Sequence, residues 1–216
     1  CLIVSVLGLL LAACAANANL QSDLDQGYVP MATPTTSDTE TGFRAWVADF
    51  ERRAIAAGLA PQTVQAVLDP VTFQPNIIAL DRKQPETQLT LRQYLDKTVS
   101  ASRIAQGRAK LAEQADNVQK VAAETGVPAS ILVALWGKET SYGAVTGGYA
   151  IGDALATLAY EGRRRAFFEA ELLDFMRVTQ RVRQNPAQLQ GSWAGAMGQC
   201  QFMPSSYLKY AVDGDG

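Results

Sequence analysis

Along residues 42–126 the hydrophobic positions recur with the period of an α-helix. The clearest stripe has spacings of i, i+3, i+4, i+7 and i+11, and it consists of Phe43, Trp46, Val47, Phe50 and Ala54. Apolar residues at these spacings share one face of a helix, and the following Gly58 and Pro61 are typical stop signals. The pattern therefore predicts a helix that turns this stripe toward a core.

Further helices are predicted in the same region, which we interpret as one helical domain. A short helix begins at Pro61, because proline is tolerated in the first turn, and ends at Asp69. One or two longer helices are expected between Leu91 and Glu124. The positions expected to face the core are Val64, Val67, Leu68, Tyr94, Leu95, Val99, Ile104, Leu111, Val118 and Val121.

Residues 127–216 are more apolar and richer in glycine, and they predict a second domain. A nearly unbroken apolar helix pattern over 128–136 indicates burial on all sides. Two more helices are expected around 154–158 and 168–176, the latter with Phe168, Leu172, Phe175 and Met176 on one face. The segment 191–204 has no regular period and predicts a packed loop.

The first 41 residues differ from the rest of the sequence. Residues 1–13 form an uncharged apolar run that is shorter than the ~20 residues needed to span a bilayer. The run fits the apolar region of a truncated secretory signal peptide. Residues 14–41 are predicted to form a flexible tether, because the sequence from Asn19 to Thr41 is polar, with prolines and no helical or strand period.

The sequence Leu11-Ala12-Ala13-Cys14 resembles a bacterial lipobox. This resemblance implies a lipid on Cys14 and attachment at the periplasmic face of the outer membrane. The alternative is ordinary signal cleavage after Ala18, within an A-x-A pattern, which would release a soluble periplasmic protein. Both alternatives predict export.

The composition excludes several classes of function. The 216 residues include no histidine, so triads that use histidine, histidine zinc sites and histidine-ligated iron are ruled out. The 19 Lys and Arg against 21 Asp and Glu leave a formal net charge of −2 without a basic tract. We therefore expect no nucleic-acid partner.

Glu139 is the strongest candidate for acid–base chemistry. It is the first acidic residue after the long apolar helix pattern and lies near the expected C-terminal end of that helix. A helix C-terminus and apolar surroundings both disfavour a negative charge, so they favour the protonated carboxyl group that a general acid needs. The alternative is a solvated glutamate paired with Lys138 or an arginine.

Three motifs in order carry a family resemblance. They are Trp136-Gly137-Lys138-Glu139-Thr140-Ser141-Tyr142-Gly143, then Ala154-Leu155-Ala156-Thr157-Leu158-Ala159-Tyr160 with Arg163-Arg164-Arg165, then the run from Gly191 to Tyr207. Together they resemble the membrane-bound lytic murein transglycosylase B family. The resemblance implies a mainly α fold, in which a helical domain (42–126) packs on a lysozyme-like α+β catalytic core (127–216) with a small β element. We expect the sequence to stop before that core is complete.

The resemblance also implies the reaction. Family members cleave the β-1,4 bond between N-acetylmuramic acid and N-acetylglucosamine in peptidoglycan glycan strands and form 1,6-anhydromuramic acid. Glu139 would be the single catalytic acid and base, because the C6 hydroxyl of the substrate is the nucleophile and no second carboxylate or cofactor is needed. The alternatives are a hydrolytic muramidase and a peptidoglycan-binding lipoprotein without catalysis.

Further residues take expected roles from the same resemblance. Ser192 and Gln201 match positions that line sugar subsites, while Arg163 and Arg164 match basic residues that face the peptide stem. Hydroxyl, amide and guanidinium groups suit these ligands, although a loop-closing serine, a structural glutamine and a solvated basic helix start are the alternatives. Tyr142 could stack on a sugar or belong to a core, and so could Trp193.

The sequence ends in an acidic segment with an Asp-x-Asp-Gly pattern. Asp213 and Asp215 resemble the start of a calcium-binding loop, in which alternate oxygens reach one cation. Some family members bind calcium in this loop. The alternative is an ordinary acidic turn.

Overall fold

A computed structural model of the protein describes residues 40–83 and 90–214. Cys14, residues 14–39 of the predicted tether and Asp215 lie outside the described residues. Glu40 and Thr41, the last two residues assigned to the tether, instead belong to the first helix. The chain forms two compact units, and the described part of the first consists of 90–145 with 210–214, while that of the second consists of 40–83 with 146–209. The predicted boundary between residues 126 and 127 does not follow this division. Both units are discontinuous in sequence, and the second is so because the first predicted helix packs against the helix that begins at Ile151.

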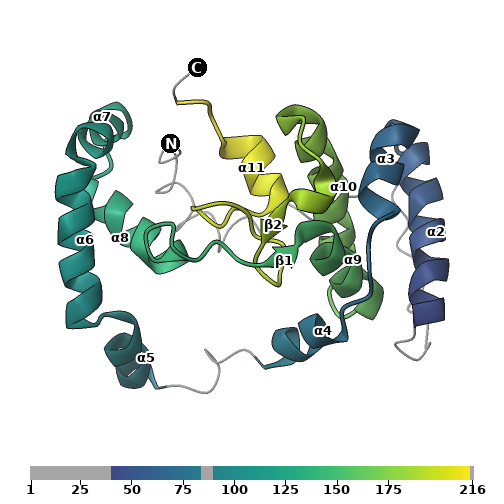
Figure 1. Ribbon diagram of the computed structural model, residues 1–216, viewed down its shortest axis with the longest axis horizontal. Helices are drawn as coiled ribbons and strands as arrows, with labels where there is room; N and C mark the ends of the chain where they lie inside the picture. Colours follow the sequence, from purple (N-terminus) through teal and green to yellow (C-terminus); the bar gives the residue numbers. More distant parts are fainter. Residues whose placement is uncertain (1–39, 84–89, 215–216) are drawn as a thin grey trace. The chain divides into compact units, whose positions relative to one another are not determined.

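The second unit is built on a pair of packed helices, α9 and α10, against which α2, α3 and α4 lie (Figure 1). Its elements are α2 (Glu40–Ala56), α3 (Pro61–Leu68), α4 (Pro75–Arg82), β1 (Tyr149–Ala150), α9 (Ile151–Glu161), α10 (Arg165–Val182), η2 (Pro186–Gln188), β2 (Gln190–Gly191) and α11 (Pro204–Tyr210). The helix predicted from the first stripe is confirmed as α2, and the one predicted from Pro61 is confirmed as α3.

The core of the second unit confirms the two apolar faces expected there. All five residues of the α2 stripe are buried, and so is the α10 face formed by Phe168, Leu172, Phe175 and Met176. Aromatic rings add directional contacts, since the rings of Trp46 and Phe50 stack with centroids 5.2 Å apart. Burying apolar area of this kind is the main favourable term in folding.

The first unit contains α5 (Leu91–Thr98), α6 (Ala101–Glu113), α7 (Ala115–Thr125) and α8 (Ala129–Thr140). The prediction of one or two helices between Leu91 and Glu124 is wrong, because the segment is divided into three helices, with breaks at Val99–Ser100 and at Gln114. The Thr90 side chain accepts from the Gln93 amide at the start of α5, and the Ser100 hydroxyl accepts from the Arg103 amide at the start of α6. A capped start is a stable helix end, so Ser100 begins a new helix, whereas the break at Gln114 between α6 and α7 has no side-chain cap.

The expected core faces in this segment are also corrected. Of the predicted positions only Val118 is fully buried, while Leu95, Val99 and Ile104 are 45%, 55% and 45% exposed. Val99 and Ile104 instead line a cavity of about 380 Å³ in this unit, together with residues of α8. The expected burial of 128–136 on all sides is wrong too, because Ile131 is 39% exposed. A cluster of Val118, Val127, Leu132 and Val133 forms the small core.

Among the described residues no single helix combines the length and the hydropathy needed to cross a membrane. The pair α7 and α8 satisfies these criteria only when both helices are taken together, and the two are bent by 112°.

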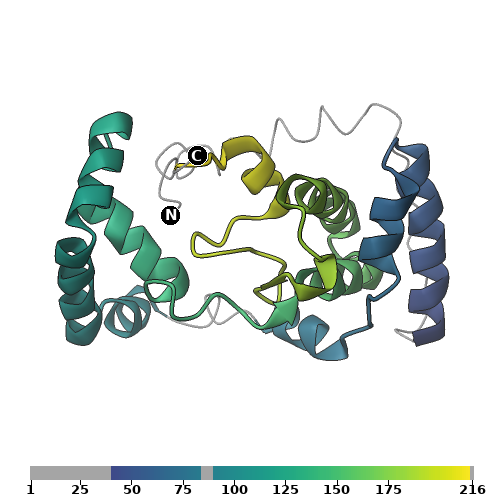
Figure 2. The same cartoon turned by 45° about the horizontal axis from the view of Figure 1, so that its top comes forward.

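The predicted small β element is confirmed in the second unit (Figure 2). Strands β1 and β2 pair in antiparallel register, with Tyr149 opposite Gly191 and Ala150 opposite Gln190. Isolated bridges join Gly191 to Met197 and Met197 to Phe202, so the chain after β2 folds back on itself.

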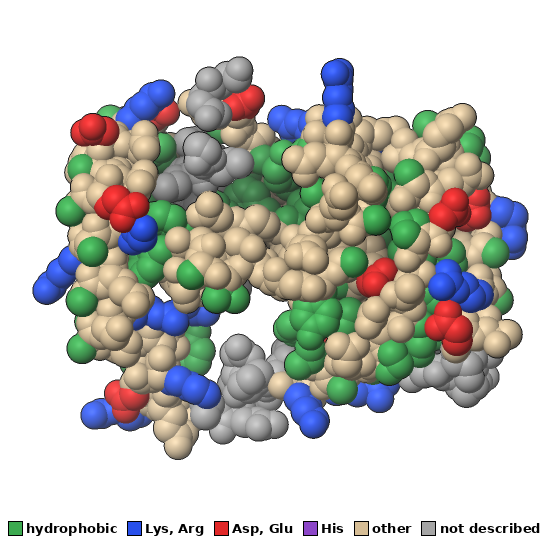
Figure 3. Space-filling model, viewed as in Figure 1, with side chains coloured by type: hydrophobic (Ala, Val, Ile, Leu, Met, Phe, Trp, Pro, Cys, Tyr) green, Lys and Arg blue, Asp and Glu red, His purple; other side chains and the backbone are tan. Residues whose placement is uncertain are grey.

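Charged side chains on the face drawn in Figure 3 are of both signs and lie interspersed over the described residues. Several of them pair within one helix, such as Arg44 with Glu40 at 2.9 Å and Arg177 with Asp174 at 2.6 Å. Exposed pairs of this kind contribute little to stability.

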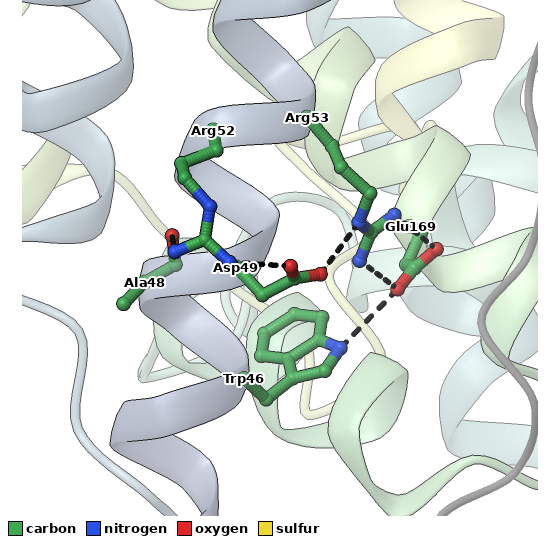
Figure 4. A network of polar contacts seen from close by, with 6 residues as sticks. All are labelled: Trp46, Ala48, Asp49, Arg52, Arg53 and Glu169. Carbon is green, nitrogen blue, oxygen red and sulfur yellow. Dashed lines mark hydrogen bonds and ion pairs between the residues drawn. The ribbon is translucent and has the colours of Figure 1, made fainter.

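One carboxylate lies inside the core of the second unit. The Glu169 side chain is 0% exposed and accepts hydrogen bonds from Trp46 Nε1 at 3.2 Å and from two Arg53 nitrogens at 2.9 and 3.1 Å (Figure 4). Arg53 also donates to Asp49 at 2.8 Å. This network joins α2 to α10. Burial raises the pKa of Glu169 from 4.5 to about 7.

The raised pKa of Glu169 predicts a pH-dependent stability. Between pH 4.5 and about 7 the folded protein binds a proton that the unfolded chain releases, so the free energy of unfolding falls as pH rises through this window. The slope is at most about 1.4 kcal/mol per pH unit. Since the side chain of Glu169→Gln does not titrate, the stability of the wild type relative to this variant will decrease with rising pH.

Urea unfolding of both proteins at several pH values between 4.5 and 7.5 measures this change. Glu124→Gln, on the exposed surface of α7, is the matched control and will show no such trend. A difference between wild type and Glu169→Gln that stays constant with pH would contradict the prediction, because it would mean that Arg53 keeps the carboxylate ionised throughout.

Candidate active site

Glu139 lies in the last turn of α8, as the sequence predicts, and its side chain is exposed. The apolar surroundings expected for it are therefore not found. The next residue, Thr140, is 1% exposed, and its hydroxyl donates to the carbonyl of Trp136 at 3.4 Å and accepts from the amide of Gly143 at 3.1 Å. The backbone beside Glu139 is thus held firmly while the carboxyl group faces solvent.

Helix α8 ends in two consecutive residues with left-handed backbone conformation. Ser141 has φ of 50° and Tyr142 has φ of 61°. The Ser141 amide donates to the Gly137 carbonyl at 3.1 Å, which closes the helix end. A residue other than glycine in this region of φ costs roughly 1–2 kcal/mol, and such strain concentrates at functional sites. The end of α8 that carries Glu139 is therefore a strained and well-defined structure.

Ser192 organises the loop that follows β2. Its hydroxyl accepts from the amides of Ala194 at 3.3 Å and Ala196 at 3.0 Å, and its own amide donates to the Ala196 carbonyl at 2.9 Å. Glycine is required beside it, since a Cβ at Gly195 would lie 2.4 Å from a methyl carbon of Leu155 in α9. The loop-closing role is present, and the sugar-binding role of Ser192 stays a prediction.

Gln201 lies in the same loop and has a left-handed φ of 49°. Its side-chain Nε2 donates to the carbonyl of Thr146 at 3.1 Å and to that of Gly198 at 2.9 Å. These bonds tie the loop to the segment before β1. The structure therefore brings Ser192 and Gln201 together in one loop of the second unit, whereas Glu139 belongs to the first unit.

The two predicted stem-binding arginines share one carboxylate partner. Asp81 lies at the end of α4 and is 4% exposed. One of its carboxylate oxygens accepts from Arg163 Nη2, and the other accepts from Arg164 Nη2 at 2.8 Å. The hydrogen bond that Arg163 donates to Asp81 raises the pKa of the Arg163 guanidinium above its ordinary value. The side chain of Arg163 is 49% exposed and that of Arg164 is 41% exposed, so each has hydrogen-bond donors open to solvent. Contact with a peptide stem stays a prediction.

Sequence reasoning missed the carboxylates that hold these segments in place. Glu171 on α10 is 4% exposed and accepts from the Ser205 amide at 3.0 Å and hydroxyl at 2.6 Å, so it caps the start of α11. Burial raises the pKa of Glu171, and the bonds from Ser205 act against this. The only signal in the sequence was a charged residue within an apolar helix face.

Other predicted residues have structural contacts. Tyr142 donates its hydroxyl to the Arg103 carbonyl at 3.0 Å, and its ring lies edge-on to Trp136 at 5.7 Å. Trp193 is half-buried and packs against the main core of the second unit. A contribution of either ring to sugar stacking stays a prediction.

The described residues do not provide a calcium site. Asp213 is exposed, and among residues 40–83 and 90–214 no three His, Cys, Asp or Glu side chains gather as metal ligands. Calcium takes roughly six to eight oxygen ligands, so Asp213 alone cannot hold it.

The comparisons with known proteins agree with this architecture. A family model described as "Transglycosylase SLT domain" matches residues 42–216, and the chain belongs to this transglycosylase family. The chain is 35% identical to membrane-bound lytic murein transglycosylase B of Escherichia coli strain K12 over 171 residues, which is 74% of this chain and 47% of that protein.

Solved structures agree with the fold class. SltB3 of Pseudomonas aeruginosa, crystallised with NAG-anhNAM-pentapeptide, matches with a TM-score of 0.75 and 40% identity, covering 81% of this chain and 46% of that one. Soluble lytic transglycosylase SltB1 of the same organism matches with a TM-score of 0.73 and 35% identity, covering 79% and 58%. The mainly α, lysozyme-like fold class is confirmed. The chain spans about half the length of these relatives.

The hydrogen bonds of Ser192 predict a measurable effect on the loop. In Ser192→Ala the amides of Ala194 and Ala196 lose their acceptor, so their hydrogen exchange will accelerate about 5- to 10-fold, equivalent to about 1 kcal/mol. Ser192→Thr keeps the hydroxyl and will exchange near the wild-type rate. Equal protection of both amides in Ser192→Ala and wild type, measured by NMR, would show that the hydroxyl does not organise the loop.

Proposed function

We propose that this protein is a lytic transglycosylase of peptidoglycan. It cleaves the β-1,4 bond between N-acetylmuramic acid and N-acetylglucosamine and leaves a 1,6-anhydromuramic acid end. The observation that carries the proposal is the similarity to SltB3, whose structure holds NAG-anhNAM-pentapeptide, at 40% identity over 81% of this chain. Membership of the transglycosylase family supports the same reaction class.

Glu139 performs both proton transfers in this proposal. The protonated carboxyl group donates to the glycosidic oxygen while the bond from this oxygen to C1 of the muramic acid breaks. The carboxylate then accepts the proton of the C6 hydroxyl, whose oxygen forms the new bond to C1. The leaving sugar keeps the donated proton as a C4 hydroxyl. Neither water nor a change of oxidation state is involved, so the reaction needs no cofactor.

The charges of the described residues support a mechanism with one carboxylate. In the second unit Asp81, Glu169 and Glu171 are buried and held by arginine, tryptophan or serine donors. Asp153 accepts from the Thr72 hydroxyl at 2.6 Å and so joins α9 to the segment before α4. These carboxylates have structural roles, whereas Glu139 is exposed at a strained helix end.

The loop of the second unit supplies sugar-binding groups in this proposal. Ser192 and Gln201 have a hydroxyl and an amide that hydrogen-bond N-acetyl and hydroxyl substituents. The solvent-exposed donors of Arg163 and Arg164 bind carboxylates of the peptide stem.

The proposed chemistry predicts the effect of Glu139→Gln. In the full-length protein this variant will release soluble fragments from peptidoglycan at least about 1,000-fold more slowly than the wild type, because the glutamine side chain can neither donate nor accept the proton. Glu124→Gln, which is exposed on α7, is the matched control and will keep wild-type turnover. Unchanged lysis by Glu139→Gln would leave only a binding role.

Mass analysis of the products of the wild type separates the two catalytic alternatives. Products with 1,6-anhydro ends, which are lighter by one water than hydrolysis products, are expected. Reducing ends would identify a hydrolytic muramidase instead.

We also propose that Cys14 carries a lipid that holds the protein at the periplasmic face of the outer membrane. The lipobox-like sequence before Cys14 and the membrane-bound name of the E. coli relative support this proposal. Cleavage after Ala18 would give a soluble periplasmic protein instead.

Fractionation of cells that express the full-length protein tests the anchor. Wild type and the control Cys200→Ser will remain with the membranes, because Cys200 lies in the folded second unit. Cys14→Ser will move to the soluble fraction or keep an uncleaved signal peptide, and it will lose incorporation of labelled palmitate. Wild-type protein in the soluble periplasmic fraction would contradict the anchor.

A further inference from the structure

Two glycines on neighbouring helices of the first unit leave room for one aromatic ring. A Cβ at Gly137 of α8 would lie 2.5 Å from two ring carbons of Tyr142 and 2.6 Å from its hydroxyl oxygen. A Cβ at Gly107 of α6 would lie 2.8 Å from the same hydroxyl oxygen. Glycine weakens a helix interior, so its presence at both contacts with one ring has a specific steric reason.

The same ring makes directional contacts with both helices. The hydroxyl of Tyr142 donates to the carbonyl of Arg103 in α6 at 3.0 Å. The ring meets that of Trp136 in α8 edge-on, with centroids 5.7 Å apart and planes at 87°. Edge-on packing and a part-buried hydroxyl with a hydrogen-bond partner are both favourable. Tyr142 therefore lies as a wedge between α6 and α8.

The backbone of this wedge belongs to the strained end of α8. The amide of Tyr142 donates to the Trp136 carbonyl at 3.3 Å, which turns the chain back so that the side chain lies against the helix it has just left. Ser141 and Tyr142 both have positive φ, a conformation that persists only where surrounding contacts hold it. The wedged ring provides such contacts.

We propose that Tyr142 is a positioning residue for Glu139, which sets the rotation of the last turn of α8 and thereby the direction of the Glu139 carboxyl group. Glu139 lies between Gly137 and Tyr142 in the sequence, so both ends of its segment are fixed by the same ring. This inference rests on the role of Glu139 under "Proposed function". In this role Tyr142 acts through Glu139 and needs no contact with the sugar.

The reason for an effect on rate is geometric. Proton transfer to the glycosidic oxygen needs the acid within hydrogen-bonding distance, and a misplacement of about 1 Å can cost on the order of 100-fold in rate. A shift of the ring would rotate the last turn and misplace Glu139, while the sugar-binding loop of the second unit would keep its own hydrogen bonds.

A double-mutant cycle tests the inference in the full-length protein, with a soluble glycan of alternating N-acetylglucosamine and N-acetylmuramic acid as substrate. Gly107→Ala adds a methyl group that collides with the Tyr142 hydroxyl at 2.8 Å but lies 3.6 Å from the nearest ring carbon. It is expected to lower kcat at least about 10-fold and to leave KM within about 2-fold. Tyr142→Phe alone will lower kcat by less, because the ring remains in place.

The decisive result is the combination of the two changes. Tyr142→Phe removes the colliding oxygen, so Gly107→Ala/Tyr142→Phe will recover kcat to within about 3-fold of Tyr142→Phe alone. Gln106→Ala, at an exposed position of α6, is the matched control and will keep wild-type kcat. An unchanged kcat in Gly107→Ala, a loss that the second change does not rescue, or an effect on KM alone would each overturn the inference.

Two further measurements keep the test unambiguous. If Gly107→Ala does not fold, Tyr142→Leu replaces it, because this variant removes the ring without adding bulk to α6. Tyr142→Leu is expected to lower kcat at unchanged KM. An unchanged kcat in Tyr142→Leu overturns the inference. Glu139→Gln is assayed in parallel. Turnover that persists in Glu139→Gln refutes the proposed function. If Glu139→Gln loses turnover but Gly107→Ala keeps the wild-type kcat, only the positioning role of Tyr142 is refuted.

Discussion

The packing of α2 across the α9–α10 pair is the constraint on which the second unit depends. It buries the aromatic stripe of α2 against an apolar face from a distant part of the chain, and it encloses Glu169 with its donors Trp46 and Arg53. A buried carboxylate is costly unless it is fully hydrogen-bonded, so the position of α2 relative to α10 is narrowly defined. The strands and the loop after β2 are attached to this framework.

The loop after β2 is held in one conformation by close packing at its glycines and by side-chain hydrogen bonds. Its glycines allow close approach, with Gly195 against Leu155 and Gly191 against the carbonyl of Ala196. Ser192 and Gln201 then provide the hydrogen bonds that a regular strand would otherwise make. Their polar groups serve the loop first, and any sugar would meet a surface that is already ordered. Binding to a preorganised surface costs less conformational entropy.

The helices of the first unit are held together by different interactions. Its apolar core is small, and it is supplemented by side-chain caps at the starts of α5 and α6 and by the Tyr142 ring between two glycines. This arrangement concentrates strain at the end of α8, next to Glu139. Local order there comes from steric fit more than from the amount of apolar surface that is buried.

The apolar pattern by itself determined most helices, the core face of α2 and that of α10, because burial imposes the helical period directly on the sequence. The apolar pattern that precedes Glu139 also placed this residue correctly at a helix end. The pattern failed between Leu91 and Glu124, where exposed valine and isoleucine line a cavity and not a core. Only the tertiary structure decided that Arg163 and Arg164 share Asp81, that Glu171 caps α11 and that Glu139 is exposed. These contacts join residues far apart in the chain, and the period of a single helix holds no information about its partners.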